Sequence, residues 1–287
     1  MFKYILYYLK NFLILIRINQ PTGIMLLMFP AIWSILIVLK EEINIYLLLL
    51  FAYGSFIMRS AGCIINDILD KKIDRNIERT KSRPLASEKL ENSDAIILLI
   101  IFLSIGLSIL LSLNSICILL GFIAFPLILI YPLMKRFTYF PQLFLAIVFN
   151  FSVLISWSAA KGEFDNQSLL LYLACIFWTL AYDTIYAYQD INDDKKIGIK
   201  SLAIYLEQNI KFWIILFYLI FIGIFIFLAI LNSMNLIFFI IITLVTFKIF
   251  YEFFKTKGLH PKDCLKIFHM NSWHGFFLTI GLFSNYI

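Results

Sequence analysis

The chain has 287 residues, of which 62% are hydrophobic and only 15% are charged, and its formal net charge is +6. Soluble domains are usually about half apolar and about a quarter charged, so too little polar surface remains here to coat a soluble globule. The composition excludes an ordinary soluble protein and predicts a single integral membrane domain over 1–287. Apart from the positive charge, nothing in the sequence points to nucleic-acid binding.

The first twenty residues are both basic and apolar. Their uninterrupted apolar run at 12–16 is shorter than the core of a signal peptide, and no cleavage motif of small residues follows it. We therefore expect residues 1–20 to lie along the membrane surface, with Lys3, Lys10 and Arg17 facing the lipid headgroups.

Apolar runs of spanning length follow one another along the rest of the chain. A helix needs roughly 20 apolar residues to cross a bilayer, and these runs are continuously apolar, whereas the strands of a membrane barrel alternate. The sequence thus predicts an all-α integral membrane protein. About nine transmembrane helices are expected, near 22–39, 45–64, 95–112, 114–132, 141–160, 168–187, 212–231, 235–254 and 267–286.

The positive charges orient these spans. Of the 24 Lys and Arg residues, all except Lys40 and Lys161 fall on the side that holds the N-terminus and the loops after even-numbered spans. By the positive-inside rule this side is cytoplasmic. We expect a multi-pass protein of the bacterial inner (plasma) membrane, with its N-terminus in the cytoplasm.

An acidic segment follows the second predicted span. If that span continues as a helix, Asn66, Asp70 and Asp74 repeat every four residues and share one helical face, with Asp67 beside them. Carboxylates stacked at the membrane edge are costly unless a cation lies near them. The segment is therefore a candidate metal site.

A similar segment ends the sixth predicted span. Asp190 and Asp194 are again four residues apart, and Asp183 lies about two turns earlier on the same helical face. The stretch 189–197 parallels 66–73 with one Asp inserted, and both stretches follow even-numbered spans. We expect two carboxylate rows that face each other at the cytoplasmic ends of their helices.

Two facing carboxylate rows repel each other unless a cation lies between them. Carboxylate and amide oxygens suit Mg²⁺, which keeps water or phosphate in its remaining positions, so a magnesium-bound diphosphate is the predicted ligand. Nearby Arg and Lys side chains can stabilise a departing diphosphate. The candidates are Arg79, Arg83, Lys135, Arg136 and Lys200.

Two charged residues, Arg59 and Asp183, lie deeper in the predicted spans, where charges are usually functional. A cation-coupled transporter is an alternative class, because transporters also bind ions with acidic residues. That class predicts charges at mid-membrane, whereas most acids here lie at span ends beside Arg and Lys. The four Cys and three His residues lack the spacing of a disulfide framework or a zinc site.

The motifs resemble those of the UbiA superfamily of intramembrane prenyltransferases. The patterns are NDxxDxxxD at 66–74, RTxxRP at 79–84, YxxxK at 131–135 and DxxxD at 190–194, and the match runs from 17 to about 205. Within the superfamily, RxxxPTG at 17–23 and YDTxYAxxD at 182–190 are most similar to the members that prenylate 4-hydroxybenzoate.

This resemblance implies about nine helices around a central cavity, with the Asp motifs on a cap. It implies Mg²⁺-dependent transfer of a polyprenyl group from polyprenyl diphosphate to the ring carbon ortho to the hydroxyl of 4-hydroxybenzoate, in ubiquinone synthesis. A naphthoate, haem or chlorophyll-type ring stays open as the acceptor.

The resemblance also assigns roles to residues. The implied metal ligands are Asn66, Asp67, Asp70, Asp74, Asp190 and Asp194. Tyr131 and Lys135 would contact the diphosphate, and Arg17 and the deeper Arg59 are candidates for binding the aromatic acceptor. Asp190 and Asp183 are the candidate bases that remove the ring proton.

Overall fold

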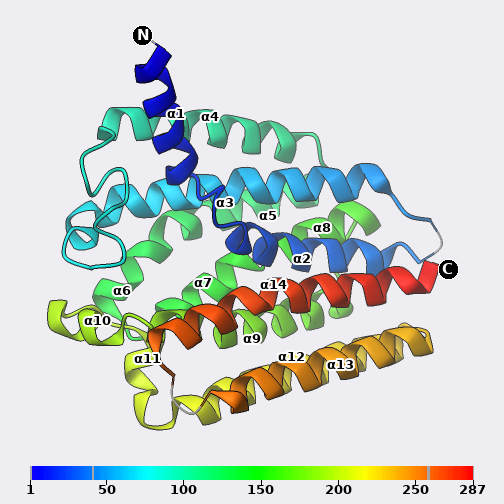
Figure 1. The fold of residues 1–287 in the computed structure, drawn as a ribbon. Helices are drawn as coiled ribbons and strands as arrows, with labels where there is room; N and C mark the ends of the chain where they lie inside the picture. The colour runs from blue at the N-terminus through cyan, green and yellow to red at the C-terminus, as the bar shows by residue number, and fades with distance from the viewer. Residues whose placement is uncertain (1, 41, 257–258, 287) are drawn as a thin grey trace.

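The computed structural model describes residues 2–40, 42–256 and 259–286, and every regular element within these ranges is helical (Figure 1). The all-α prediction is confirmed. Two of the basic residues used to orient the spans, Lys257 and the side chain of Lys3, lie outside the described part of the chain.

Long helices run side by side in one bundle (Figure 1). They are α2 (Thr22–Val38), α3 (Ile45–Asp74), α4 (Asn92–Leu111), α5 (Ser115–Ile130), α7 (Pro141–Phe149), α8 (Phe151–Lys161), α9 (Asn166–Tyr188), α12 (Ile210–Leu231), α13 (Leu236–Lys255) and α14 (Pro261–Phe283). The remaining helices are α1 (Phe2–Leu15), α6 (Met134–Phe137), α10 (Ile191–Ile197) and α11 (Leu202–Tyr205).

Each predicted span corresponds to one long helix or, for 141–160, to the pair α7 and α8. Within the described residues, 7 helical segments are long and apolar enough to cross a membrane. Helix α2 is shorter than these, and α14 begins with a polar stretch that includes Lys262, Asp263 and Lys266. The fold is that of a multi-pass membrane protein, and nine is an approximate count of its spans.

The break between α7 and α8 falls at Asn150. Its buried side-chain amide donates hydrogen bonds to the Ala146 carbonyl at 2.8 Å and to the Thr179 hydroxyl at 2.9 Å. Polar groups within a bilayer must find partners inside the protein. These two bonds therefore stabilise the break and connect it to α9.

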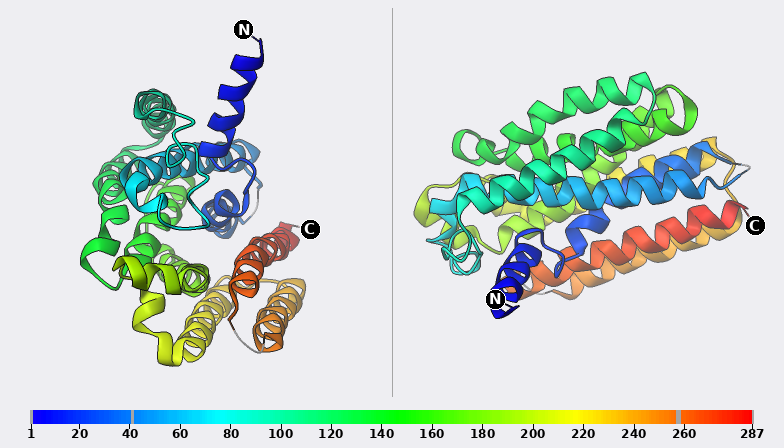
Figure 2. Two further views of the ribbon diagram at one scale, coloured as in Figure 1. Left: turned by 60° about the vertical axis from the view of Figure 1, so that its left-hand side comes forward. Right: turned by 90° about the horizontal axis from the view of Figure 1, so that it is seen from above.

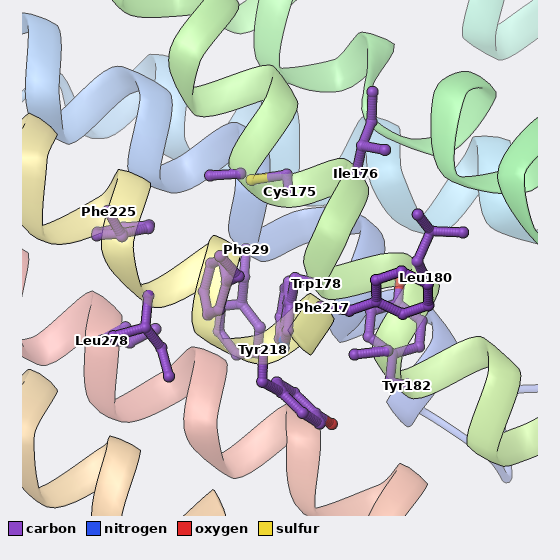
Figure 3. Close-up of a cluster of buried hydrophobic side chains, with 14 of the residues drawn as sticks. Phe29, Cys175, Ile176, Trp178, Leu180, Tyr182, Phe217, Tyr218, Phe225 and Leu278 are labelled. Carbon is purple, nitrogen blue, oxygen red and sulfur yellow. The ribbon is translucent and has the colours of Figure 1, made fainter. Parts of the chain in front are cut away.

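The side of the bundle built from α2, α9, α12 and α14 is tightly packed with aromatic rings (Figure 3). The ring centroid of Trp178 lies 4.9 Å from that of Trp33 and 5.6 Å from that of Phe221. Trp178 Nε1 and the Tyr218 hydroxyl both donate to Asn271 Oδ1, each at 3.0 Å. Because lipid is as apolar as these side chains, close packing and buried hydrogen bonds hold such helices together.

Helix α1 runs crosswise to the bundle and extends away from it (Figures 1 and 2). It contacts α3, and Leu6, Tyr7, Leu9 and Leu13 on it are exposed. This orientation suits a helix that lies in the plane of the membrane surface, which stays a prediction.

Candidate active site

The two acidic segments meet at one end of the bundle, which we call the acidic end. Arg79, which follows α3, joins them, because its guanidinium donates to both carboxylate oxygens of Asp190 at 2.6 to 3.1 Å. It also donates to the Tyr186 hydroxyl at 2.8 Å. The loop after the first acidic segment thus binds the second segment, since Arg79 and Asp190 are 111 positions apart along the chain.

The first acidic segment is the last part of α3, which continues unbroken to Asp74. This continuation places Asn66, Asp70 and Asp74 one turn apart on one face. The side chains of Asp67, Asp70 and Asp74 are buried, and Asn66 is half-buried. Burying carboxylates is costly unless they are paired with cations and hydrogen-bonded, so their partners decide how the site is held together.

Arg17 and Arg83 pair with two of these carboxylates. Arg17 Nη2 lies 2.6 and 2.9 Å from the two oxygens of Asp67. Arg83 Nη1 bridges Asp67 at 3.2 Å and Asp74 at 2.8 Å. Arg17 adopts a left-handed backbone conformation, with φ of 60°, and such conformations persist where contacts fix them. The fork on Asp67 is such a contact, and it connects the α1–α2 turn to the acidic end.

Asp70 pairs with cations from another part of the chain. The Lys135 ammonium forms an ion pair with Asp70 Oδ2, and Arg136 lies 3.7 Å from Oδ1. Lys135 and Arg136 belong to α6, which lies at the acidic end in Figure 1. Oδ1 of Asp70 is buried and has no hydrogen-bond partner within the described chain. One lone-pair-bearing oxygen is therefore left for a ligand.

The loop after α3 folds back so that its arginines reach the carboxylates. The Thr80 hydroxyl donates to the Asp74 carbonyl at 3.0 Å, which satisfies one of the carbonyls left free at the helix end. Leu85 and Leu90 are buried against Ile64 of α3. These contacts place the RTxxRP segment over the end of the helix that precedes it.

The second acidic segment differs from its prediction. A continuous helical row from Asp183 to Asp194 is wrong, because α9 ends at Tyr188 and Asp190 is the N-terminal cap of the short helix α10. The Asp190 side chain makes no capping hydrogen bond to α10; Arg79 binds its carboxylate at the break instead. Asp190 and Asp194 remain one turn apart, since the Asp194 amide donates to the Asp190 carbonyl at 2.9 Å.

Burial and the neighbouring Asp190 carboxylate raise the pKa of Asp194 to about 6. Burial opposes the charge of Arg79, but Tyr186 and Asp190 outweigh it and raise the pKa of this guanidinium above its usual value. The same balance, with Asp67 and Asp74 as the anions, raises the pKa of Arg83. Both arginines therefore stay charged while Asp194 can take up a proton.

Lys200 is not directed at the carboxylates. Its ammonium donates to the Phe137 carbonyl at 3.2 Å and lies 5.5 Å from the centre of the Tyr139 ring. Its backbone amide, in contrast, donates to the Lys135 carbonyl at 3.0 Å. The main chain of Lys200 supports the site, and its side chain points elsewhere.

A cavity of about 500 Å³ lies among α2, α3, α4, α5, α7 and α8. Its walls are mostly apolar, and Arg59 and Tyr131 supply polar groups. The wall residues Ile100, Phe122 and Phe125, on α4 and α5, are exposed, so the cavity is not sealed at these two helices.

Arg59 is held beside this cavity by close packing. Its guanidinium lies 5.4 Å from the centre of the Phe149 ring, and a Cβ on Gly23 would come within 2.7 Å of its Nε. Gly23 belongs to the PTG motif, so glycine there makes room for the arginine. Arg59 Nε is buried without a hydrogen-bond partner among the described residues, and Asp183 and Tyr131 lie within electrostatic reach.

The acidic end has the donors of a hard divalent cation. In the part of the chain that the structure describes, no three His, Cys, Asp or Glu side chains already converge as a metal site, because Arg17, Arg79, Arg83 and Lys135 occupy the carboxylates. The free oxygen of Asp70 and an all-oxygen donor set nevertheless fit such an ion. A cation would enter by taking over carboxylates from these internal partners.

Tyr186 is a residue that the sequence interpretation did not select. It lies one turn before Asp190, accepts a hydrogen bond from Arg79, and its ring lies 5.1 Å from that guanidinium. Helical spacing from Asp190 could have indicated it. Arg136, one of the predicted diphosphate contacts, donates to the Leu69 carbonyl at 2.8 Å.

The chain matches the model of the UbiA prenyltransferase family over residues 27–279, and it belongs to this family. It is 39% identical over 280 residues to a mitochondrial 4-hydroxybenzoate polyprenyltransferase of Caenorhabditis elegans, covering 96% of this chain and 79% of that protein. It is 38% identical to a 4-hydroxybenzoate octaprenyltransferase of Psychromonas ingrahamii, covering 95% of each. The protein is thus a membrane prenyltransferase, which decides against the transporter alternative.

Solved structures show the same fold. The apo UbiA homologue of Aeropyrum pernix K1 superposes with a TM-score of 0.78 at 22% identity, covering 92% of this chain and 98% of that one. A UbiA homologue of Archaeoglobus fulgidus, bound to GPP and Mg²⁺, gives 0.71 at 16% identity, covering 96% and 99%.

Proposed function

We propose that this protein transfers a polyprenyl group from a polyprenyl diphosphate to the ring carbon ortho to the hydroxyl of 4-hydroxybenzoate, a step of ubiquinone biosynthesis. One observation carries the proposal: the carboxylates and cations of the acidic end adjoin a mostly apolar cavity, and Arg59 and Tyr131 are among its few polar wall residues. The names of the relatives from Caenorhabditis elegans and Psychromonas ingrahamii support the choice of acceptor.

Magnesium is the metal of this proposal. The candidate ligands are Asn66, Asp67, Asp70, Asp74, Asp190 and Asp194, which offer only oxygen atoms, and such donors suit Mg²⁺. When bound, the metal supplies Lewis-acid chemistry and neutralises charge on the diphosphate. The Archaeoglobus fulgidus homologue bound to GPP and Mg²⁺ supports this choice.

The cations of the acidic end have two successive partners in this proposal. Lys135, Arg79 and Arg83 form ion pairs with Asp70, Asp190 and Asp67, respectively. If these carboxylates instead bound a metal ion, the three cations would be free to donate to the diphosphate oxygens, together with the Tyr131 hydroxyl. Charge-assisted hydrogen bonds of this kind stabilise a leaving group as its charge grows.

The cavity protects the prenyl group as its bond to oxygen breaks. The allylic carbon then carries positive charge, and water would capture it. The apolar walls exclude water and hold the chain, and the unsealed side at α4 and α5 lets a long tail extend into lipid. The electron-rich ring of the acceptor then attacks this carbon.

The acceptor needs a cation for its carboxylate and a base for the ring proton. Arg59 lines the cavity and has a free Nε in the described structure, so we assign the carboxylate to Arg59. Arg17 forms an ion pair with Asp67, so we assign it the role of positioning the Asp67 carboxylate. Asp183, near Arg59, and Asp190 are the two candidate bases.

In this proposal the protein lies in a bacterial inner membrane, and the acidic end is on the cytoplasmic side. With nine spans and a cytoplasmic N-terminus, the C-terminus lies on the opposite face. A C-terminal alkaline phosphatase fusion should be active and a C-terminal fluorescent protein fusion dark. The reverse result would overturn this orientation.

The direct test is an assay of purified protein in lipid with Mg²⁺, prenyl diphosphates and a choice of acceptors. We expect prenylated 4-hydroxybenzoate, lost when Mg²⁺ is chelated and restored when it is added back. If a naphthoate were prenylated as fast as 4-hydroxybenzoate or faster, the acceptor in this proposal would be wrong. If no ring were prenylated, the whole proposal would be refuted.

A further inference from the structure

Four glycines line the cavity: Gly54 and Gly62 on α3, Gly106 on α4 and Gly121 on α5. At Gly106 an added Cβ would lie 2.7 Å from the sulfur of Met58, and at Gly121 it would collide with Leu110. These two glycines therefore make room for side chains of neighbouring helices.

Gly54 and Gly62 are different. An added Cβ at either would meet no atom of the described chain within 4 Å, although Gly62 is buried. Since both residues line the cavity, the space beside them is cavity space. Glycine is a poor residue for a helix interior, so its presence twice along one open face calls for a reason, and open space for a ligand supplies one.

The two glycines lie at different depths. They are separated by eight residues, which places them on the same side of α3. With a helical rise of about 1.5 Å per residue, Gly62 lies about 12 Å and Gly54 about 24 Å from Asp70 along the helix axis. Gly62 is close in sequence to Arg59, whereas Gly54 neighbours Leu50 and Phe51 in the cavity wall.

We infer that Gly54 and Gly62 determine how long a prenyl chain the cavity accepts, and this inference rests on the proposed function. An extended isoprene unit, four C–C bonds along its chain, advances on the order of 5 Å. The diphosphate between Asp70 and the first carbon of the donor adds about 5 Å. A donor of two units then extends about 15 Å from Asp70, which passes Gly62 but ends before Gly54. A donor of four units extends about 25 Å and reaches Gly54, and longer donors continue beyond it.

The inference predicts a length-dependent defect. A bulky side chain at Gly54 meets only the distal part of a chain, so it should exclude long donors and spare short ones. The same side chain at Gly62 lies beside the first units and should impair every donor. Tight packing against a new side chain typically lowers the rate about tenfold or more.

The experiment compares Gly54→Leu, Gly62→Leu and Gly223→Leu in purified protein, with geranyl diphosphate and geranylgeranyl diphosphate as donors and 4-hydroxybenzoate as acceptor. Gly223 on α12 is the matched control, because it is exposed, is not a wall residue of the cavity, and a Cβ there meets nothing described within 4 Å. For Gly54→Leu we expect kcat/KM to fall about tenfold with the longer donor and to stay within about twofold with the shorter one.

Gly62→Leu should lower kcat/KM with both donors, and Gly223→Leu with neither. An equal effect of Gly54→Leu on both donors, or on neither, overturns the inference. If Gly54→Leu does not fold, Gly54→Ala and Gly54→Val replace it, and a ratio of the two donor rates that stays at the wild-type value in both also overturns it. Failure of the wild type to prenylate with any donor would instead refute the proposed function.

Discussion

The first acidic segment is the end of one long helix, whereas the second lies across a helix break. In the first, Asp67, Asp70 and Asp74 are buried and pair with cations from three separate parts of the chain. In the second, Asp190 pairs with Arg79, and Asp194 forms no ion pair within the described residues. One acidic segment is thus rigid and neutralised, and the other is less constrained and carries uncompensated charge.

This difference suggests a division of labour. The rigid segment fixes the position of the metal and diphosphate, because its carboxylates are part of the bundle. The broken segment can adjust to the ligand, because α10 is a short helix that ends at Ile197 and is followed by Gly198, whose φ of 74° suits glycine. The predictions below test this comparison, from the largest expected effect to the smallest.

Removing the charge of Asp70 should have the largest effect. Asp70→Asn keeps the shape of the side chain but removes the negative charge of a carboxylate whose Oδ2 pairs with Lys135 and whose Oδ1 has no hydrogen-bond partner among the described residues. We expect kcat/KM to fall by about a hundredfold or more, measured as prenyl transfer by purified protein. The matched control is Asp193→Asn, which removes an acid that pairs with Lys196 within one turn of α10.

Asp193→Asn should stay within about twofold of wild type, since ion pairs of this exposed kind contribute little. Near-normal turnover by Asp70→Asn at full expression would sink the idea that the first segment fixes the ligand.

Arg79 joins the two segments, so its replacement tests whether they act together. Arg79→Lys keeps the charge but cannot bind both Asp190 oxygens and the Tyr186 hydroxyl at once. We expect kcat/KM of Arg79→Lys to fall about tenfold. In the double variant with Asp190→Asn, kcat/KM should fall by less than the product of the two single effects. The control is Lys81→Ala, which removes an exposed partner of Glu78. Fully multiplicative effects of Arg79→Lys and Asp190→Asn would mean that the two segments act independently.

Asp194 should make metal binding depend on pH. Burial and the Asp190 carboxylate raise its pKa to about 6, so the ligand-free protein carries a proton there below that pH and must release it to bind a cation. Mg²⁺ affinity should therefore fall between pH 7 and 5.5, by up to about tenfold per pH unit. Calorimetric titrations check this, and Asp194→Asn should remove part of the slope; an unchanged slope would contradict it.

Much of the fold could be predicted because lipid imposes a simple rule on sequence. Apolar runs in a bilayer must be helices, so about nine spans follow from the runs themselves. The continuation of α3 to Asp74 follows from the four-residue spacing of its acidic residues. The break at Asn150 could not be predicted, since it depends on a hydrogen bond to Thr179 of another helix. The break at Asp190 likewise depends on Arg79, which is distant in sequence.

The sequence also could not predict which cation pairs with which carboxylate. Sequence indicated that Arg79, Arg83 and Lys135 belong near the acids, but not that each would occupy a particular carboxylate in the ligand-free protein. Such choices depend on where loops return, and helical periodicity carries no information about loops. The same limit applies to Lys200, whose position near the motif suggested a contact with the diphosphate.

Lys200 offers the smallest expected effect and the finest test. Its ammonium donates to the Phe137 carbonyl, and its backbone amide donates to the carbonyl of Lys135. Lys200→Ala keeps that amide, so kcat/KM should stay within about twofold of wild type, as for most surface changes.

Lys200→Pro removes the amide hydrogen and frees the Lys135 carbonyl, so it should lower kcat/KM several-fold further, at about the cost of one hydrogen bond. Comparing the two variants in the same prenyl-transfer assay separates main chain from side chain. If Lys200→Ala costs as much as Lys200→Pro, the ammonium itself reaches the diphosphate, and the second acidic segment supplies a cation as well as its carboxylates.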